Sequence, residues 1–141
     1  MNRLLSNIQE NQVTQSGPSP ISPAVTVADL PPAVRRAGEL ALEKKATDVV
    51  VLDLRGLSSA TDYFVLATGA SDTQIKAVAD HVIDELKKEG SRPNHVEGLG
   101  GGQWTLLDYV DFVVHIFHPT SRGYYQLELL WGDAPRVEFS E

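Results

Sequence analysis

The sequence predicts an α/β domain, a mixed sheet of about five strands with helices packed on it. Short runs of Val, Leu, Ile and Phe alternate with longer segments in which apolar residues recur at helical spacing. The chain has 141 residues, of which 42% are hydrophobic, so it is long enough for one domain with its own core. Strands are expected at 48–52, 62–68, 95–96, 104–107 and 111–117, and helices at 31–45, 71–90 and 121–130.

Residues 1–30 are expected to form a disordered extension ahead of a domain at 31–141. The extension is rich in Asn, Gln, Ser and Pro, and its segment 16–23 combines glycine with prolines that break regular structure. Pro31 and Pro32 suit the start of the first helix, because proline is tolerated in a helix's first turn. The strands at 48–52 and 62–68 carry unbroken apolar runs, which are typical of strands buried on both faces.

The helix at 71–90 has the clearest pattern. Ser71 and Gln74 have the spacing of a capping box, and Gly90 is placed to end the helix. The apolar residues between them recur on one face: Ile75, Val78, Ala79, Val82, Ile83 and Leu86. After a flexible glycine loop at 98–102, the strands at 104–107 and 111–117 are expected to pair antiparallel through an acidic turn. Residues 137–139 are expected to add an edge strand.

Composition excludes several classes of protein. The chain has no cysteine, which excludes a disulfide framework, a cysteine-based zinc site and thiol catalysis. No apolar run reaches the roughly 18 residues of a membrane-spanning helix, so no membrane association is expected. The N-terminal residues lack the apolar core of a secretory signal and the arginines of a transit peptide. We therefore expect a cytoplasmic protein.

The formal net charge of −7 is concentrated in the C-terminal part. From Glu97 onward there are seven acidic and two basic residues, and every lysine lies at or before Lys88. Nucleic-acid binding needs clustered Lys and Arg, so no direct nucleic-acid binding is expected through this part. A basic protein is the natural complement of such a surface, although many proteins are acidic for solubility alone.

The strongest motif in the chain combines these acidic residues with aromatic ones. Residues 103–117 read QWTLLDYVDFVVHIF, and residues 124–131 read YYQLELLW. This pattern resembles the signature of the ribosomal silencing factor family, the Iojap-like proteins: Trp-x-x-x-Asp, a Val-Val-His strand, then Tyr-x-Leu-Glu-x-Leu-Trp. Residues 52–65 and 69–72 match the rest of that signature, so the resemblance spans about residues 33–131.

The resemblance implies a fold similar to nucleotidyltransferase domains and a translation repressor that is not an enzyme and needs no cofactor. Such a factor binds the large ribosomal subunit through a small basic protein of the intersubunit face, the large-subunit ribosomal protein numbered fourteen. It would then physically block joining of the small subunit. The resemblance also implies a homodimer in the free state, and it marks Trp104, Asp108, Tyr125 and Glu128 as partner-binding residues.

Two other functions stay open. One is an assembly adaptor for the large subunit without a silencing role, which the sequence does not separate from silencing. The other is a nucleotidyltransferase-like enzyme, because the turn 69–72 is similar to the one with which such enzymes hold a triphosphate. Those enzymes need converging carboxylates for two magnesium ions, and the usual pair is not found on the next strand. Capping of the helix by Ser71 and Asp72 is the favoured interpretation.

Other candidate sites have simpler explanations. The glycines at 98–102 lead into a strand, not into a helix N-terminus, so they do not predict a phosphate loop. His115 and His118 point to opposite faces of an extended strand, so no metal site is expected, and His115 is expected to be a buried or half-buried sheet residue with a hydrogen-bonded ring. Trp104 is expected on an edge strand as a surface anchor, because tryptophan often dominates such contacts. For Phe112 and Trp131, core packing is an equal option.

Overall fold

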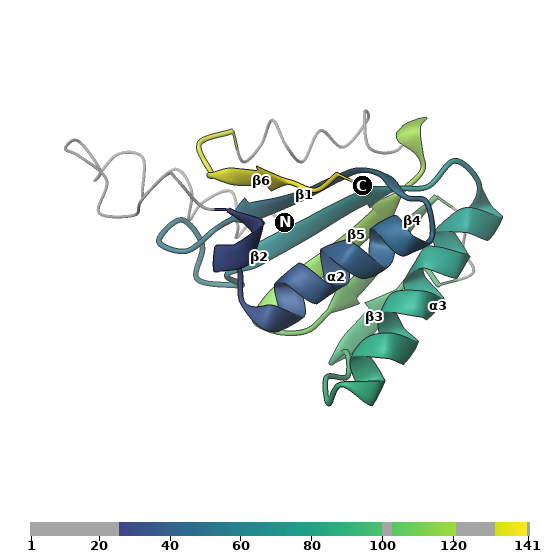
Figure 1. The fold of residues 1–141 in the computed structure, drawn as a ribbon, viewed down its shortest axis with the longest axis horizontal. Helices are drawn as coiled ribbons and strands as arrows, with labels where there is room; N and C mark the ends of the chain where they lie inside the picture. Colours follow the sequence, from purple (N-terminus) through teal and green to yellow (C-terminus); the bar gives the residue numbers. More distant parts are fainter. Residues whose placement is uncertain (1–25, 100–102, 121–131, 141) are drawn as a thin grey trace.

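The computed structural model describes residues 26–99, 103–120 and 132–140, and it confirms the predicted α/β class. A mixed sheet of six strands carries two α-helices on one of its faces (Figure 1). The strands are β1 (Thr47–Asp53), β2 (Tyr63–Thr68), β3 (His95–Glu97), β4 (Trp104–Asp108), β5 (Phe112–Phe117) and β6 (Arg136–Glu138). The helices are α2 (Pro32–Glu43) and α3 (Asp72–Lys88), preceded by the 3₁₀ helix η1 (Val27–Asp29). The predicted helix at 121–130 lies outside the described residues.

The strands lie in the order β3-β4-β5-β2-β1-β6, with β2 and β5 parallel and every other pair antiparallel. The strand predicted at the C-terminal edge is β6, which pairs with β1. The prediction that Trp104 lies on an edge strand is wrong, because β3 pairs with β4 and takes the edge. The register places His95 opposite Asp108 and Glu97 opposite Leu106, so Trp104 lies beyond the end of β3.

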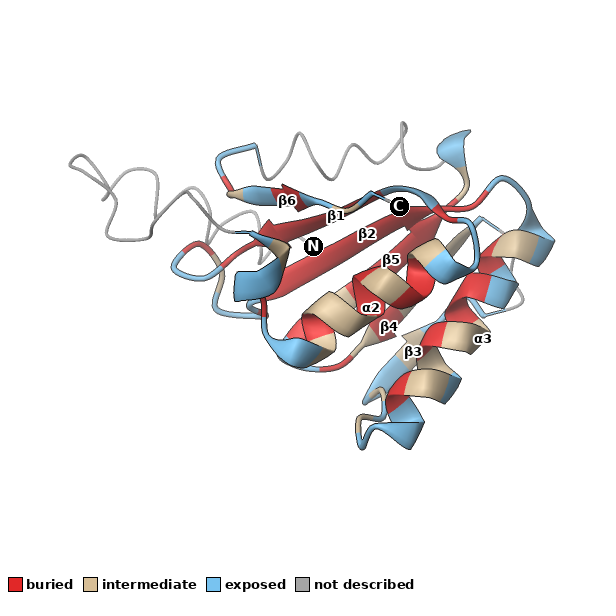
Figure 2. Ribbon diagram, viewed as in Figure 1, coloured by how far each residue is buried: buried red, intermediate tan, exposed pale blue. Residues whose placement is uncertain are grey.

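The two faces of the sheet belong to separate apolar clusters, and the central strands are buried along most of their length (Figure 2). Val51, Val65 and Ile116 pack in the cluster that includes the apolar sides of α2 and α3. Leu52 and Phe64 belong to the second cluster. Since alternate residues of β1 and β2 enter different clusters, both strands are buried on both faces, as their unbroken apolar runs predict.

The ends of α3 are fixed by the residues that the sequence indicates. Ser71 Oγ accepts the backbone N–H of Gln74 at 3.1 Å, which confirms the capping role of Ser71. At the other end, the N–H of Ser91 donates to the C=O of Leu86 at 2.8 Å. Gly90 lies between them with φ +97°, a left-handed conformation that glycine adopts without strain. Gly90 therefore ends the helix as predicted.

The packed part of the chain includes the residues just before α2. The carboxylate of Asp29 accepts hydrogen bonds from the backbone N–H and the hydroxyl of Thr26, at 3.2 and 2.9 Å. Leu30 is buried in the main core cluster. Residues 1–25 lie outside the described residues, so the disordered extension remains a prediction.

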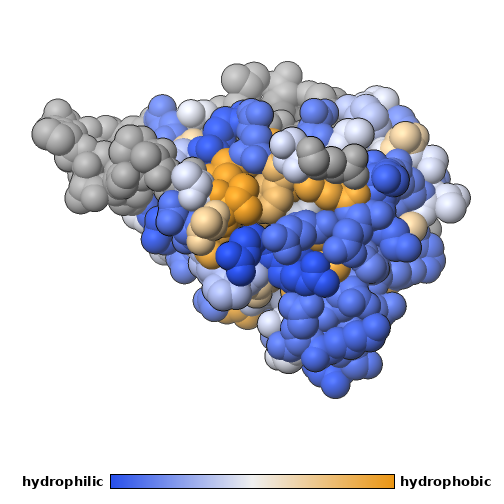
Figure 3. Space-filling view, viewed as in Figure 1, coloured by the Kyte–Doolittle hydropathy of each residue, from blue (hydrophilic) through white to orange (hydrophobic). Residues whose placement is uncertain are grey.

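On the face that carries the helices, hydrophilic residues cover α3, and hydrophobic residues show between α2 and β6 (Figure 3). Phe139, directly after β6, lies against Gly38 of α2, where an added Cβ would come within 2.6 Å of the phenyl ring. Glycine at position 38 therefore lets the end of the chain pack on α2. No helix in the described part is long and apolar enough to cross a membrane.

Candidate partner-binding surface

The structure places two of the four predicted partner-binding residues at opposite ends of one strand. Trp104 begins β4 and Asp108 ends it. Their side chains share one face of the sheet because they are four residues apart, but that spacing separates them by roughly 13 Å. Tyr125 and Glu128 lie outside the described residues. The negative charge of Asp108 and Asp111 therefore does not surround Trp104.

At its own end of β4, Trp104 is half-buried and held by aromatic neighbours. Its indole N–H donates to Nδ1 of His115 at 3.1 Å. The indole ring lies 5.6 Å from the His115 ring and 5.2 Å from the Phe117 ring, measured between centroids. Part of the large apolar area of Trp104 is therefore already used within the protein.

His115 is 1% exposed, which confirms the predicted buried histidine with a hydrogen-bonded ring. Burial lowers the pKa of His115 to about 3, so the ring is neutral at physiological pH. Because Nδ1 accepts the Trp104 N–H, Nε2 carries the proton of the neutral ring. Nε2 has no hydrogen-bond partner within the described residues. The Phe64 ring packs against the imidazole edge-on, 4.6 Å between centroids.

The turn between β4 and β5 has an unusual backbone. The N–H of Asp111 donates to the C=O of Tyr109 at 2.9 Å, which closes a three-residue γ-turn centred on Val110. Val110 has φ +74°, which is rare and strained for a β-branched residue. Its side chain is 58% exposed. The turn therefore holds an apolar side chain in solvent despite an unfavourable backbone conformation.

Hydrogen bonds from two segments hold Val110 in this conformation. Asp108 Oδ1 accepts the Val110 N–H at 2.8 Å, and the Thr61 hydroxyl donates to the Val110 C=O at 3.0 Å. The N–H of Asp62 donates to the C=O of Asp111 at 3.0 Å. Asp108 thus has a structural role in the turn, besides the predicted role in partner binding.

The loop that carries Thr61 and Asp62 is itself anchored by an ion pair. Asp53 is 1% exposed, and its carboxylate accepts from Arg55 Nε at 2.9 Å and Nη2 at 2.7 Å. These contacts raise the pKa of Arg55, with the Asp53 hydrogen bonds as the main cause. The guanidinium also lies over the Tyr63 ring, 5.5 Å from its centroid. Both segments that form this end of the molecule are therefore fixed by bonds within the fold.

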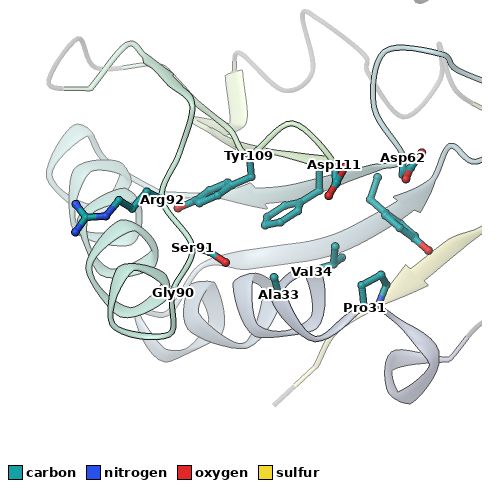
Figure 4. Close-up of a pocket in the computed structure, with 11 residues that line it drawn as sticks. Pro31, Ala33, Val34, Asp62, Gly90, Ser91, Arg92, Tyr109 and Asp111 are labelled. Atoms are coloured by element: carbon teal, nitrogen blue, oxygen red, sulfur yellow. The ribbon is translucent and has the colours of Figure 1, made fainter.

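A pocket of about 490 Å³ opens beside this turn (Figure 4). It is lined by Pro31, Ala33, Val34, Asp62, Tyr63, Gly90, Ser91, Arg92, Tyr109, Asp111 and Phe112. Asp62 and Asp111 lie side by side at one end, while Ser91 and the Tyr109 hydroxyl lie at the other, and the Arg92 side chain leads away. Burial raises the pKa of Tyr109 to about 12, and its hydroxyl has no hydrogen-bond partner in the described part of the chain.

Sequence reasoning missed this pocket because its walls come from the start of α2, the end of α3 and two strand connections. Only the topology brings these segments together. A local signal did exist for the strained turn: a β-branched residue, Val110, stands between Tyr109 and Asp111 where a tight turn calls for Gly or Asn.

The turn at 69–72 is used for capping. Besides the bond from Gln74 N–H to Ser71 Oγ, Gln74 Oε1 accepts the Ala70 N–H at 2.6 Å. Its amide nitrogen donates to the C=O groups of Lys44 and Lys45, at 3.1 and 2.9 Å. The turn therefore joins the end of α2 to the start of α3, which supports the capping interpretation. No three His, Asp or Glu side chains converge as a metal site anywhere within residues 26–99, 103–120 and 132–140.

Comparisons with known proteins extend over most of the chain. The family model "Ribosomal silencing factor during starvation" matches residues 27–141. A Bacillus subtilis protein named ribosomal silencing factor RsfS is 43% identical over 96 residues, 68% of this chain and 81% of that protein. A Zea mays protein named Iojap, chloroplastic, is 36% identical over 133 residues, 92% of this chain and 58% of that protein. A solved structure from Chromobacterium violaceum has a TM-score of 0.70 at 38% identity and covers 72% of this chain and 84% of its own.

Proposed function

This chain belongs to the family of ribosomal silencing factors, and on that premise we propose that it represses translation by binding the large ribosomal subunit. The bound protein blocks the approach of the small subunit by its bulk. Its partner is a basic protein of the intersubunit face, the large-subunit ribosomal protein numbered fourteen. The observation that carries this proposal is the match of the family model to residues 27–141.

The electrostatic character of the chain supports a basic partner. The formal net charge is −7, and seven acidic residues against two basic ones lie from Glu97 onward. The β4–β5 turn adds an exposed apolar side chain between two aspartates. Complementary charge speeds association and fixes orientation, while apolar contacts supply most of the binding free energy. Trp104, Asp108, Tyr125 and Glu128 remain the proposed partner-binding residues.

Sedimentation tests the proposal directly. Purified protein is mixed with isolated large subunits and run through a sucrose gradient, and small subunits are then added. We expect the protein to migrate with the large subunits and the fraction of joined ribosomes to fall as its concentration rises. Full joining at a saturating concentration of bound protein contradicts silencing and supports the assembly adaptor. No binding to large subunits contradicts both.

The enzyme alternative is tested by heating the protein with magnesium and ATP or CTP. We expect no change in melting temperature, because the turn at 69–72 already uses Ser71 Oγ and the Ala70 N–H within the fold. A stabilising shift that requires both metal and nucleotide supports a nucleotidyltransferase-like activity. We also propose that the free protein is a cytoplasmic homodimer, which light scattering on a size-exclusion column tests.

Truncation at the N-terminus separates the proposed extension from the domain. Deleting residues 1–25 should leave the melting temperature and large-subunit binding nearly unchanged, because such a polar segment has little apolar surface to bury. Deleting residues 1–30 should lower the melting temperature, because it also removes the buried Leu30. A loss of large-subunit binding on the shorter deletion shows that the extension contacts the ribosome.

A further inference from the structure

The pocket beside the β4–β5 turn has two carboxylates at one end that are not paired directly with a cation among the described residues. Asp62 and Asp111 line it, and neither carboxylate makes a hydrogen bond or an ion pair among the described residues. Arg55, on the same loop as Asp62, forms its ion pair with Asp53 at 2.7 Å and interacts with Asp62 only through the longer-range electrostatic attraction. The Arg92 guanidinium points away from the pocket in Figure 4. A ligand with a positive charge is therefore favoured at this end.

The middle of the pocket is apolar and aromatic. Tyr109 and Phe112 stack with ring centroids 4.8 Å apart and planes 7° from parallel. Ala33 and Val34 of α2 form the opposite wall. Such a wall suits the alkyl stem of a basic side chain, and an aromatic face also attracts a planar guanidinium.

The end of the pocket away from the aspartates can take a neutral polar group. Figure 4 shows Ser91 and the Tyr109 hydroxyl there. The Tyr109 hydroxyl is buried without a partner in the described part of the chain, which is costly and uncommon in folded proteins. A ligand with a cation at one end, an apolar stem and an amide at the other matches this order of groups.

We propose that this pocket receives a basic side chain of a polypeptide partner, arginine in preference to lysine. The proposal rests on the proposed function, in which the partner is a basic ribosomal protein. The cation pairs with Asp62 and Asp111, the stem lies against Phe112 and Val34, and the main-chain amide lies at the Ser91 end. Arginine is favoured because its planar group is less strongly hydrated than an ammonium and stacks on aromatic rings.

The neighbourhood of the pocket favours a polypeptide over a free small cation. Val110 lies between two lining residues, Tyr109 and Asp111, and its side chain is 58% exposed. An exposed apolar side chain beside a charged pocket gives a macromolecule a second contact, which a small cation does not use.

Nuclear magnetic resonance of the ¹⁵N-labelled full chain tests the pocket with matched tripeptides. The probes are acetyl-Gly-Arg-Gly-amide, its lysine counterpart and its citrulline counterpart, which keeps the shape of arginine without the charge. We expect the arginine peptide to shift the amide signals of Asp62, Ser91 and Asp111, the lysine peptide to shift them less, and the citrulline peptide to leave them unchanged. Equal shifts with citrulline, or no shifts at these residues, overturn the proposal.

Substitutions locate the binding determinants. The double variant Asp62→Asn with Asp111→Asn should weaken arginine-peptide binding about tenfold, and Ala33→Leu should weaken it by filling the pocket without changing charge. Asp84→Asn removes an exposed carboxylate on α3 outside the pocket and should have no effect. The carboxylates of Asp62 and Asp111 are exposed, so the double variant should fold, which a circular dichroism melt checks. Unchanged peptide binding by both pocket variants overturns the proposal.

Sedimentation with large ribosomal subunits then separates this inference from the proposed function. We expect the double variant to bind large subunits about tenfold more weakly than wild type, and Asp84→Asn to bind like wild type.

Three other outcomes are distinguishable. If wild type binds and the double variant binds equally well, the pocket assignment is overturned while the function stands. If wild type does not bind large subunits but the arginine peptide occupies the pocket, the function fails and the pocket assignment stands. If spermidine shifts the same signals and the double variant binds large subunits normally, the occupant is a small cation and the polypeptide assignment is overturned.

Discussion

The two ends of strand β4 differ in how far their polar groups are satisfied within the protein. At the Trp104 end, the indole N–H has an acceptor in His115, and the rings pack against one another. At the other end, Val110 is exposed in a strained turn, and the nearby carboxylate of Asp111 makes no hydrogen bond or ion pair among the described residues. The side chains of the first end pack within the fold, with His115 Nε2 left without a partner among the described residues, and the second end retains exposed groups that can bind another molecule.

The strained backbone lies at the turn end of β4, at Val110. A strained backbone persists only where surrounding contacts enforce it, and such positions cluster at functional sites. The backbone conformation of Val110 is held by two hydrogen bonds, one from its N–H to Asp108 Oδ1 and one from the Thr61 hydroxyl to its C=O. The aromatic cluster around Trp104 is held by ring packing and by the hydrogen bond from Trp104 to His115. Substitutions at the two ends should therefore separate stability from binding.

The largest effect is expected at Trp104. Trp104→Ala removes the ring contacts and the donor to His115, and should lower the free energy of unfolding by about 3 kcal/mol. Trp104→Phe keeps most of the packing and loses the hydrogen bond, so it should cost about 1 kcal/mol. Urea denaturation measures both. If Trp104 is also the proposed partner anchor, folded Trp104→Ala should bind large subunits roughly thirtyfold more weakly. Wild-type stability of Trp104→Ala contradicts a stabilising role for this end.

Acid should lower the free energy of unfolding through His115, which lies at the Trp104 end of β4. Its pKa is lowered from 6.5 to about 3 in the fold, so the unfolded chain binds the proton more readily. The contribution of neutral His115 to the free energy of unfolding is complete above its unfolded pKa of 6.5. It is lost progressively as the pH falls from 6.5 towards 3. At a pH about 1.5 units below the unfolded value, the loss is about 2 kcal/mol.

The matched variant for this pH dependence is His115→Gln, which can still accept the Trp104 N–H but does not titrate. Urea denaturation of both proteins at neutral pH and in mild acid isolates the contribution of His115. We expect the stability difference between wild type and variant to move by about 2 kcal/mol in favour of the variant in acid. An identical pH dependence of the two proteins shows that His115 is not buried as described.

Most of the fold could be predicted from local sequence patterns. The unbroken apolar runs of β1 and β2 predict burial on both faces, and the capping pair Ser71 and Gln74 marks the start of α3. These signals are local because hydrophobic periodicity and caps act within a few residues. Sheet order has no such local signal, so the sequence does not show that β3 pairs with β4 and takes the edge position predicted for the strand of Trp104.

The candidate site could be predicted only in part. Family resemblance indicates Trp104 and Asp108, and the structure confirms the strand that separates them. Only the structure shows that Trp104 is half-buried against His115 and that Asp108 accepts the Val110 N–H. The pocket depends on residues far apart in the sequence, such as Val34, Ser91 and Asp111, which the topology brings together. Whether a carboxylate is paired is likewise a tertiary property, so charge composition indicates a basic partner without locating its contact.

At the turn end, removing the backbone strain should stabilise the protein. Val110→Asn should raise the free energy of unfolding by about 1 kcal/mol, because asparagine tolerates a positive φ better than a β-branched residue. Val110→Thr is the matched control: it stays β-branched and keeps the strain, so its stability should remain close to wild type. Both variants make the exposed side chain more polar, threonine by one hydroxyl in place of a methyl, and should bind large subunits a few-fold more weakly. Destabilisation by Val110→Asn contradicts the assignment of strain to this turn.

The smallest change in stability, and the cleanest separation of charge from structure, is expected at Asp108. Asp108→Asn keeps an oxygen that can accept the Val110 N–H, so the free energy of unfolding should change by less than about 0.5 kcal/mol. Asp108→Ala loses that acceptor and should cost about 1 kcal/mol.

In the proposed interface both variants lose the same negative charge, so both should bind large subunits a few-fold more weakly. Their binding should also depend less on salt, since exposed charges are screened within about 10 Å at 0.1 M. Titration of large subunits at low and moderate salt measures this. If Asp108→Asn binds like wild type at every salt concentration, the charge of Asp108 does not contribute to the interface, and the role of this residue is limited to holding Val110 in the turn.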